Sequence, residues 1–262
     1  MASNRIQDDT HSDYHAVKKT AEEAMNRGVW ESRFDPRFEK FLAREMRCEL
    51  SRDSIDAMSR GKNFMHYRGI PMAKDPLDKV IYEMLFFEIQ PKTIIELGAY
   101  TGASALWMAD AMSTYGVDTQ IISVDIDLSL VDARAKNGGR IEFREGDCNR
   151  IEALFPAEEL KSLEHPLILV DDAHVNLPQV YEYFHKEVFE TGDYLIVEDT
   201  NPHIPGTFGD SADEVMDWGD WKHKEIKSFF NEHDAEYQVD RYYTDFFGYN
   251  ATWNWNGFIR RM

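Results

Sequence analysis

The chain has 262 residues, of which 43% are hydrophobic, 13% aromatic and 29% charged. This much apolar material supports a large buried core, which excludes disordered, collagen-like and small-scaffold proteins. There are 48 Asp and Glu against 29 Lys and Arg, a net charge of −19 that disfavours nucleic acid and anionic membranes as partners. We interpret most of this charge as a solvated acidic surface, with a smaller share placed where a cation binds.

Targeting signals are absent from the sequence pattern. No apolar run reaches the roughly 18–20 residues of a membrane helix, and residues 1–10 lack the apolar core of a signal peptide. Cys48 and Cys148 stand a hundred residues apart, which argues against a disulfide framework. We therefore expect a cytoplasmic protein, and we also expect it to form homo-oligomers.

The N-terminal part has helical patterns broken by irregular sequence. Residues 14–25, 38–46 and 77–88 have helical patterns, whereas residues 61–75 contain the breakers Gly69 and Pro71. We interpret residues 1–62 as a helical extension or lid, and residues 63–262 as one α/β domain.

From residue 92 onward, short apolar runs alternate with helical patterns. This rhythm predicts a doubly wound, mostly parallel, seven-stranded Rossmann-like sheet covered by helices on both faces. The expected parallel strands are 93–97, 120–125, 140–145, 166–170 and 193–197. The expected helices are 103–112, 149–162, 177–189 and 212–231, and the runs 236–242 and 257–261 form an antiparallel hairpin that closes the sheet.

A glycine-bearing turn follows the first strand. Its sequence, Glu96 to Ser104, has the spacing E-x-G-x-x-x-G, with Gly98 and Gly102 as the glycines. Ligands dock at such strand-to-helix turns, and glycine permits close approach to the backbone. An acid beside the loop would repel a diphosphate but suits a cofactor with an amino group. S-adenosylmethionine has that group, a sulfonium and no phosphate.

Further acids follow the second and third strands. Asp125 and Asp127 end the second strand, where an acid accepts hydrogen bonds from ribose hydroxyls. Asp147 follows the third strand, where a polar side chain faces the adenine edge. One such acid alone is usually a solvated strand end. Together with Glu96 of the first strand, however, these acids stand at the ends of three successive strands, which favours a cofactor site.

The fourth and fifth strands end in paired acids. Asp171 follows one strand, and Glu198 and Asp199 follow the other. If the strands are neighbours, the three carboxylates converge and need a cation, for which oxygen ligands favour Mg²⁺, Ca²⁺ or Mn²⁺. The alternative is that these acids only cap the following helices.

A histidine lies close to the expected metal site. His174 follows Asp171 by three residues and is the candidate general base, with His203 in reserve. Residues 201–219 are interpreted as a lid over the site. The aromatic segment 242–255 is interpreted either as a core or dimer contact or as an aromatic wall for a ring substrate.

The cofactor loop resembles the first motif of the catechol O-methyltransferase group of class I methyltransferases. In that group the glutamate, first glycine, tyrosine and serine line the methionine part of S-adenosylmethionine. The resemblance implies these roles for Glu96, Gly98, Tyr100 and Ser104, and the ribose-binding role for Asp125. Thr101 and Gly102 of the same loop, and Asp171 from the metal side, are assigned to the cofactor as well.

The segments 170–174 and 196–200 resemble the cephalosporin hydroxylase family and the macrocin-type O-methyltransferases, which methylate sugars on antibiotics. The resemblance spans roughly residues 65–262 and includes the flanking segments 74–78 and 254–261. It implies that Asp171, Glu198 and Asp199 hold Mg²⁺ and that His174 is the base. Catechol enzymes have lysine at the His174 position and end the acid pair in asparagine. No two-histidine-one-carboxylate iron triad is evident, so oxygen activation is not expected.

These observations predict a Mg²⁺- and S-adenosylmethionine-dependent O-methyltransferase. The expected substrate is a small hydroxylated molecule, such as a sugar or polyketide, in which the reacting hydroxyl has a neighbouring oxygen. Two alternatives stay open. One is a methyltransferase of the same fold acting on nitrogen or carbon; the other is a non-catalytic cofactor-binding partner of a separate tailoring oxygenase.

Overall fold

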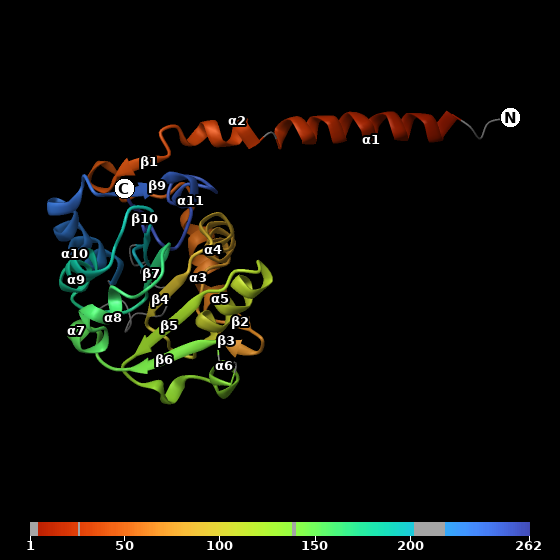
Figure 1. Ribbon diagram of the computed structural model, residues 1–262. Helices are drawn as coiled ribbons and strands as arrows, with labels where there is room; N and C mark the ends of the chain where they lie inside the picture. Colours follow the sequence, from red (N-terminus) through yellow and green to blue (C-terminus); the bar gives the residue numbers. More distant parts are fainter. Residues whose placement is uncertain (1–4, 26, 138–139, 202–217) are drawn as a thin grey trace. The chain divides into compact units, whose positions relative to one another are not determined.

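The computed structural model describes residues 5–25, 27–137, 140–201 and 218–262 (Figure 1). The chain divides into two compact units, Met1–Phe38 and Glu39–Met262. The smaller unit contains helices α1 (Arg5–Ala24) and α2 (Arg27–Glu31) and the 3₁₀ turn η1 (Ser32–Phe34). No helix in the described ranges is long and apolar enough to cross a bilayer.

The larger unit is built around an eight-stranded sheet. Its strands are β1 (Phe38–Lys40), β4 (Thr93–Leu97), β5 (Gln120–Asp125), β6 (Ile141–Glu145), β7 (Leu167–Asp171), β8 (Tyr194–Val197), β9 (Tyr237–Asp240) and β10 (Phe258–Arg261). Their order is β1-β9-β10-β8-β7-β4-β5-β6, and β2 (His66–Tyr67) pairs with β3 (Ile70–Pro71) separately. Strands β4 to β8 are parallel, and β10 lies antiparallel between β8 and β9. The doubly wound fold is confirmed; the eighth strand, unexpected from the sequence, is β1.

Helices cover both faces of the sheet. The longer ones are α3 (Arg52–Lys62), α4 (Pro76–Ile89), α5 (Ala103–Thr114), α9 (Leu177–Glu187) and α10 (Trp218–His233). The shorter ones are η2 (Phe41–Ala43), η3 (Leu128–Leu130), α6 (Ala133–Lys136), η4 (Cys148–Arg150), α7 (Ile151–Leu154), α8 (Ala157–Leu160) and α11 (Arg241–Thr244). Helices α4 and α5 pack on one face, whereas α9 and α10 pack on the other (Figure 1).

Strand β7 shows how the sequence divides the core into two layers. Side chains alternate across a strand, so Leu167 and Leu169 join the cluster under α9 and α10, while Ile168 and Val170 join the cluster under α4 and α5. All four are buried. A strand that is apolar at every position is therefore held from both sides, which fixes its register.

Two of the helices predicted from the sequence are not formed, and these predictions are wrong. Residues 38–46 form β1 and η2 instead, because Phe41 is buried and stacks on Phe230 with ring centroids 4.5 Å apart. Residues 149–162 are divided into η4, α7 and α8, and the last break falls at Pro156. The sequence pattern predicts neither helix α3 nor the β2–β3 hairpin. The expected helix 212–231 is seen as α10 from Trp218; residues 212–217 lie outside the described ranges.

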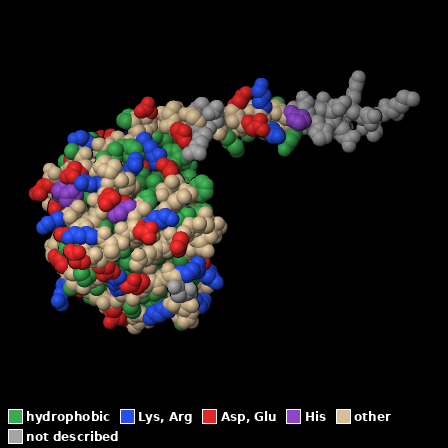
Figure 2. All heavy atoms as spheres, viewed as in Figure 1, with side chains coloured by type: hydrophobic (Ala, Val, Ile, Leu, Met, Phe, Trp, Pro, Cys, Tyr) green, Lys and Arg blue, Asp and Glu red, His purple; other side chains and the backbone are tan. Residues whose placement is uncertain are grey.

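The surface of the larger unit carries interspersed charges. On the face in Figure 2, acidic and basic side chains are mixed rather than gathered by sign. Asp110, for example, pairs with Arg68 at 3.1 Å and with Arg140 at 2.5 Å. Such exposed pairs contribute little stability, and they agree with the interpretation of most of the net charge as solvated surface.

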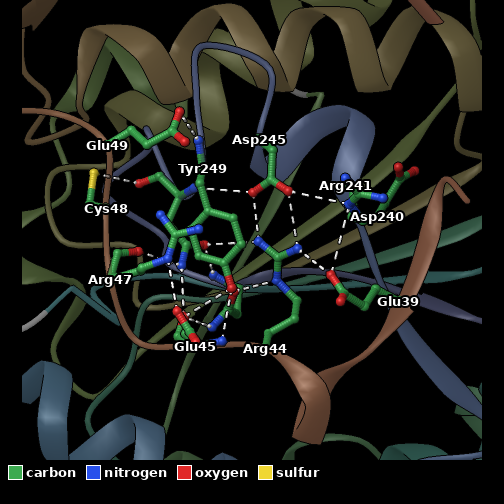
Figure 3. Close-up of polar contacts among 12 residues, drawn as sticks. Glu39, Arg44, Glu45, Arg47, Cys48, Glu49, Asp240, Arg241, Asp245 and Tyr249 are labelled. Atoms are coloured by element: carbon green, nitrogen blue, oxygen red, sulfur yellow. Dashed lines mark hydrogen bonds and ion pairs between the residues drawn. The ribbon is translucent and has the colours of Figure 1, made fainter. Parts of the chain in front are cut away.

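A buried arginine joins the segment after β1 to the segment after α11 (Figure 3). The Arg44 side chain is 0% exposed, and its guanidinium lies 2.6 Å from Asp245 and 2.9 Å from Glu39. Its Nε donates to the Asn256 side chain, and its Cζ lies 4.5 Å from the centre of the Tyr249 ring. A charge buried this fully is tolerated only because each donor has a partner.

Removing one partner of Arg44 should destabilise the protein strongly. Asp245→Asn should lower the free energy of unfolding by about 3 kcal/mol, because it leaves a buried guanidinium partly uncompensated. The exposed pair Lys40–Asp234 provides the control: Lys40 is 57% exposed, and Lys40→Gln should change stability by less than about 0.5 kcal/mol. Urea unfolding measures both, and equal effects of the two substitutions would contradict the assignment.

Candidate functional site

The candidate site lies at the carboxyl edge of the parallel strands. Leu97 at the end of β4 pairs with Asp171 at the end of β7, and Asp171 in turn pairs with Val197 at the end of β8. The two strands expected to carry paired acids are therefore neighbours. The chain also changes direction in the sheet between β4 and β7, which is where doubly wound folds open a crevice for ligands.

The loop after β4 approaches the loop after β7 closely. Gly98 has φ +102°, and a Cβ placed on it would lie 2.7 Å from the backbone oxygen of Asp172. Gly102 has φ +75°, and a Cβ placed on it would lie 2.8 Å from a side-chain carbon of Val131. Both glycines are therefore required by conformation and by space. Tyr100, 54% exposed, projects from the loop between them.

Glu96 is the buried acid of the cofactor loop. Its side chain is 0% exposed, and its Oε2 accepts a hydrogen bond of 2.5 Å from Ser123. Its Oε1 has no hydrogen-bond partner within the described chain. Burial raises the pKa of Glu96 to about 7, against the opposing effect of Lys74. A buried, unpaired carboxylate oxygen favours a bound donor such as an ammonium group.

The acids at the next two strand ends have backbone partners. Asp125 accepts from the Tyr100 N–H at 2.7 Å and from the Asp127 N–H at 3.2 Å. Asp127 caps η3, and Asp147 caps η4. The structure thus brings Asp125 against the cofactor loop, while the adenosine-binding roles of these acids stay predictions.

The expected metal ligands lie in what we call the lysine–carboxylate cluster. It contains Asp171, Asp172, Glu198, Asp199 and three lysines, Lys62, Lys74 and Lys222. Lys62 lies 2.8 Å from Asp199, and Lys74 lies 2.5 Å from Glu198 and 2.9 Å from Asp172. Lys222 lies 4.0 Å from Asp171 and donates to the backbone oxygens of Asp171 and Glu198.

Hydroxyl and indole donors complete the cluster. Tyr181 donates to Asp171 at 2.5 Å, Tyr82 donates to Glu198, and the Trp253 Nε1 donates to Asp199 at 2.6 Å. Each expected metal ligand therefore has both a lysine and a neutral donor, so none of these buried carboxylates lies uncompensated.

Burial and the lysines set the protonation of the cluster. Burial raises the pKa values of Asp171 and Glu198. Burial acts in the same direction on Asp199, but Lys62 and Lys222 outweigh it and lower the pKa of that carboxyl. Lys74 has a raised pKa because nearby carboxylates outweigh its own burial. Asp199 is therefore the firmly ionised member, held as the partner of Lys62.

Asp171, Glu198 and Asp199 have the chemistry to bind a hard divalent cation, but their carboxylates are not close enough to one another to surround an ion in this structure. All three expected ligands offer carboxylate oxygens, which such ions prefer. A candidate metal site needs three ligand atoms within 4.8 Å of one another. Among the described residues, Asp171, Glu198 and Asp199 do not meet this condition, although other groups do. A metal here has to displace lysine partners, beginning with Lys62 on Asp199.

The candidate base lies beside this cluster. Burial and the positive charge of Lys222 lower the pKa of His174, while the neighbouring carboxylates oppose this shift. The ring is therefore neutral near pH 7, as a base must be. The structure does not describe residues 202–217. His203, most of the expected lid 201–219 and the first residues of the expected helix 212–231 fall in this range. In the aromatic segment 242–255, Tyr243 and Trp255 are buried core residues.

Sequence reasoning missed the lysines. Lys74 lies in the flanking segment 74–78, but nothing in that pattern reveals its partner. Lys222 has a readable signal: it falls at helical spacing with Ile226 and Phe229 on the apolar face of α10, and it is 0% exposed. A lysine on a buried stripe predicts a buried anionic partner.

The fold and the residues at the carboxyl edge of the sheet together define a class I methyltransferase. Its features are the doubly wound sheet, the E-x-G-x-x-x-G loop at the change of direction, and acids at successive strand ends. A family model described as Rhamnosyl O-methyltransferase/CmcI matches residues 60–262, and the chain belongs to this family. These findings support an S-adenosylmethionine-dependent O-methyltransferase. The narrower likeness to cephalosporin hydroxylases and macrocin-type enzymes stays a prediction.

Curated relatives and solved structures agree with the family. The Rhamnosyl O-methyltransferase of Mycobacterium tuberculosis (strain H37Rv) is 27% identical over 203 residues, covering 74% of this chain and 77% of the relative. That of Mycobacterium leprae is 29% identical over 209 residues, covering 76% and 84%. A CmcI structure with Mg and SAM is 30% identical, with TM-score 0.61 and coverage of 76% and 77%. An apo-structure of CmcI has 28% identity, TM-score 0.62 and the same coverage.

Gly98→Ala should disrupt the cofactor loop. The new methyl group would meet the Asp172 backbone oxygen, and φ +102° is unfavourable for alanine, so we expect a loss of about 1–3 kcal/mol of stability together with weaker S-adenosylmethionine binding. Gly61 in α3 is the control, since a Cβ there meets nothing within 4 Å and Gly61→Ala should be neutral or slightly stabilising. Calorimetry and thermal unfolding test both; unchanged cofactor affinity in Gly98→Ala would refute the loop assignment.

Proposed function

We propose that this chain is a metal-dependent O-methyltransferase that moves the methyl group of S-adenosylmethionine to a hydroxyl of a small natural product, such as a sugar or polyketide. One observation carries the proposal: Gly98 of the cofactor loop lies against the backbone of Asp172, next to Asp171. The loop that would hold the sulfonium and the acids that would hold the metal are thus adjacent, so a substrate bound at the acids would lie next to the methyl donor.

Cofactor binding is assigned to the loop and to the neighbouring strand ends. Glu96 Oε1, which has no partner in the described chain, would accept a hydrogen bond from the amino group of the methionine part, and the glycines would let that part approach the backbone. Asp125 would bind the ribose, and the exposed Tyr100 would contact the cofactor from the loop. Negative charge at this edge also favours the positive sulfonium.

Asp171, Glu198 and Asp199 are the residues that would hold Mg²⁺. Bound there, the ion would lower the pKa of a substrate hydroxyl and orient it. The chemistry of the donors and the CmcI relative described with Mg and SAM support this assignment. The chain's own contribution is to hold these acids in place at the buried edge with Lys62, Lys74 and Lys222 as cationic partners.

His174 is assigned as the base that takes the hydroxyl proton. It follows β7 by three residues and stands beside the acids, and its lowered pKa keeps the ring neutral and able to accept a proton. The substrate class is supported by the family and by the curated relatives described as rhamnosyl O-methyltransferases.

One observation favours a second candidate. Each proposed metal ligand already has a lysine partner, so the lysines can supply the positive charge that a metal would otherwise bring. This arrangement fits a methyltransferase of the same family that acts without a metal. Metal dependence of methyl transfer separates the two candidates.

Removing a proposed metal ligand should abolish the metal effect without abolishing cofactor binding. In isothermal titration, Mg²⁺ should tighten S-adenosylmethionine or substrate binding in the unaltered protein but not in Asp199→Asn. Asp171→Ala should lower methyl transfer to a hydroxylated acceptor by at least about 100-fold. Glu96→Gln is the matched variant, since it should weaken cofactor binding equally with and without Mg²⁺. Unchanged methyl transfer in Asp171→Ala would exclude the metal role.

His174→Gln should lower kcat by about 100-fold or more while leaving cofactor affinity unchanged. In the unaltered protein kcat should fall as the pH drops through the pKa of His174, because only the neutral ring accepts a proton. Burial and Lys222 lower that pKa, so the fall should lie on the acid side of pH 6.5. The variant should lack this acid limb; if it keeps the limb, another group is the base.

A further inference from the structure

A second group of potential ligands lies at the far ends of α9 and α10. Glu182 and His185 stand three residues apart on α9, and His233 and Glu236 stand three residues apart where α10 leads into β9. The two helices pack side by side (Figure 1), so two nitrogen and two carboxylate donors meet from separate elements. We call these four residues the histidine–glutamate cluster.

The distances within the cluster are short. His233 Nε2 lies 2.6 Å from Glu182 Oε1, and His233 Nδ1 lies 3.1 Å from Glu236 Oε1. The rings of His185 and His233 are 4.2 Å apart between centroids. Ligand atoms of His185, His233 and Glu236 all lie within 4.8 Å of one another. Tetrahedral ligands around Zn²⁺ are about 3.4 Å apart, so small side-chain rotations close the set.

The surroundings provide the features of a metal site. Tyr237 lies 3.0 Å from His185 Nδ1, and Arg261 pairs with Glu236 Oε2, which leaves Oε1 toward the histidines. When one nitrogen of His233 binds a metal, the other keeps a carboxylate partner that fixes the ring. The glutamates are 45% and 41% exposed, so an ion can enter from solvent.

This cluster is distinct from the proposed catalytic edge. Helix α9 starts at the carboxyl edge of the sheet and runs back, so His185 in its last turn lies toward the amino edge. Tyr237, the first residue of β9, pairs with Arg261 at that same amino edge. The lysine–carboxylate cluster and the histidine–glutamate cluster therefore lie at opposite edges of one sheet.

We propose that His185, His233 and Glu236 bind a divalent transition ion such as Zn²⁺, while Glu182 holds the other ring nitrogen of His233, so that the ion joins the C-terminal ends of α9 and α10. Two imidazoles and one carboxylate, with a fourth position for water, match the ligand preference of Zn²⁺ and Co²⁺ and differ from the all-oxygen set expected for Mg²⁺. With both histidines neutral the site carries two negative charges, which a dication balances. Without metal, the His233 ring lies between the two carboxylates and makes a hydrogen bond to each.

The test is a titration of tag-free, chelator-treated protein with Zn²⁺ or Co²⁺ alone. The unaltered protein should bind one equivalent of Co²⁺ that gives the visible absorption of the tetrahedral ion, and it should unfold at a higher temperature with Zn²⁺. His185→Gln and His233→Gln should each weaken binding at least about tenfold and remove the Co²⁺ absorption. His66→Gln, which alters an exposed histidine of β2, should leave both unchanged.

A second pair of variants distinguishes a loss of metal ligands from a general loss of folding. Glu182→Gln and Glu236→Gln alter half-exposed side chains, so they should fold normally and still weaken Zn²⁺ binding. Asp171→Asn should leave the Co²⁺ absorption unchanged, because it lies at the other edge. Absence of the tetrahedral Co²⁺ absorption, or absorption that survives the double change of His185 and His233 to Gln, would overturn the proposal.

Discussion

Four carboxylates at one buried edge require compensating positive charge, and the rest of the site follows from that requirement. Asp171 and Glu198 are almost wholly excluded from water, at 0% and 3% exposure. Removing ionised groups from water costs several kcal/mol each unless charge and hydrogen bonds replace the solvent. Lys62, Lys74 and Lys222 supply that charge. A fold that buries these acids must therefore bring the three lysines to the same strand ends.

The three lysines come from widely separated parts of the chain. Lys62 ends α3, Lys74 precedes α4, and Lys222 lies within α10, so the cluster ties both helical layers to the sheet edge. The cofactor loop is tied to the same edge through Gly98 and Asp172. A metal or a substrate that changes the partner of one lysine therefore acts on elements of both layers. This gives the site a direct physical connection to the helices around it.

The sequence predicts the central sheet well because its strands carry their own signal. Strands such as β7 are apolar at every position and end in acids, so both the parallel sheet and the meeting of Asp171 with Glu198 and Asp199 at one edge follow from local pattern. The glycine loop is equally local. These features depend on a few neighbouring residues and on the rule that ligands bind at carboxyl ends.

What the sequence does not reveal depends on contacts between distant residues. The pattern of residues 38–46 predicts a helix, yet stacking of Phe41 on Phe230 overrides that pattern. The lysine partners of the acids cannot be predicted for the same reason, because Lys62 and Asp199 are far apart in the sequence and no local pattern relates them. His185 and His233 belong to this group too. Their meeting depends on the packing of α9 against α10, which periodicity predicts only in outline.

Strand β10 is the last strand in chain order, yet it lies between β8 and β9. During synthesis β8 therefore presents an open row of backbone donors and acceptors for as long as α10 and β9 are being made. Exposed strand edges pair readily with other chains. The nascent protein thus has an interval in which the β8 edge is open to pairing with other chains, and this interval ends only when β10 inserts between β8 and β9.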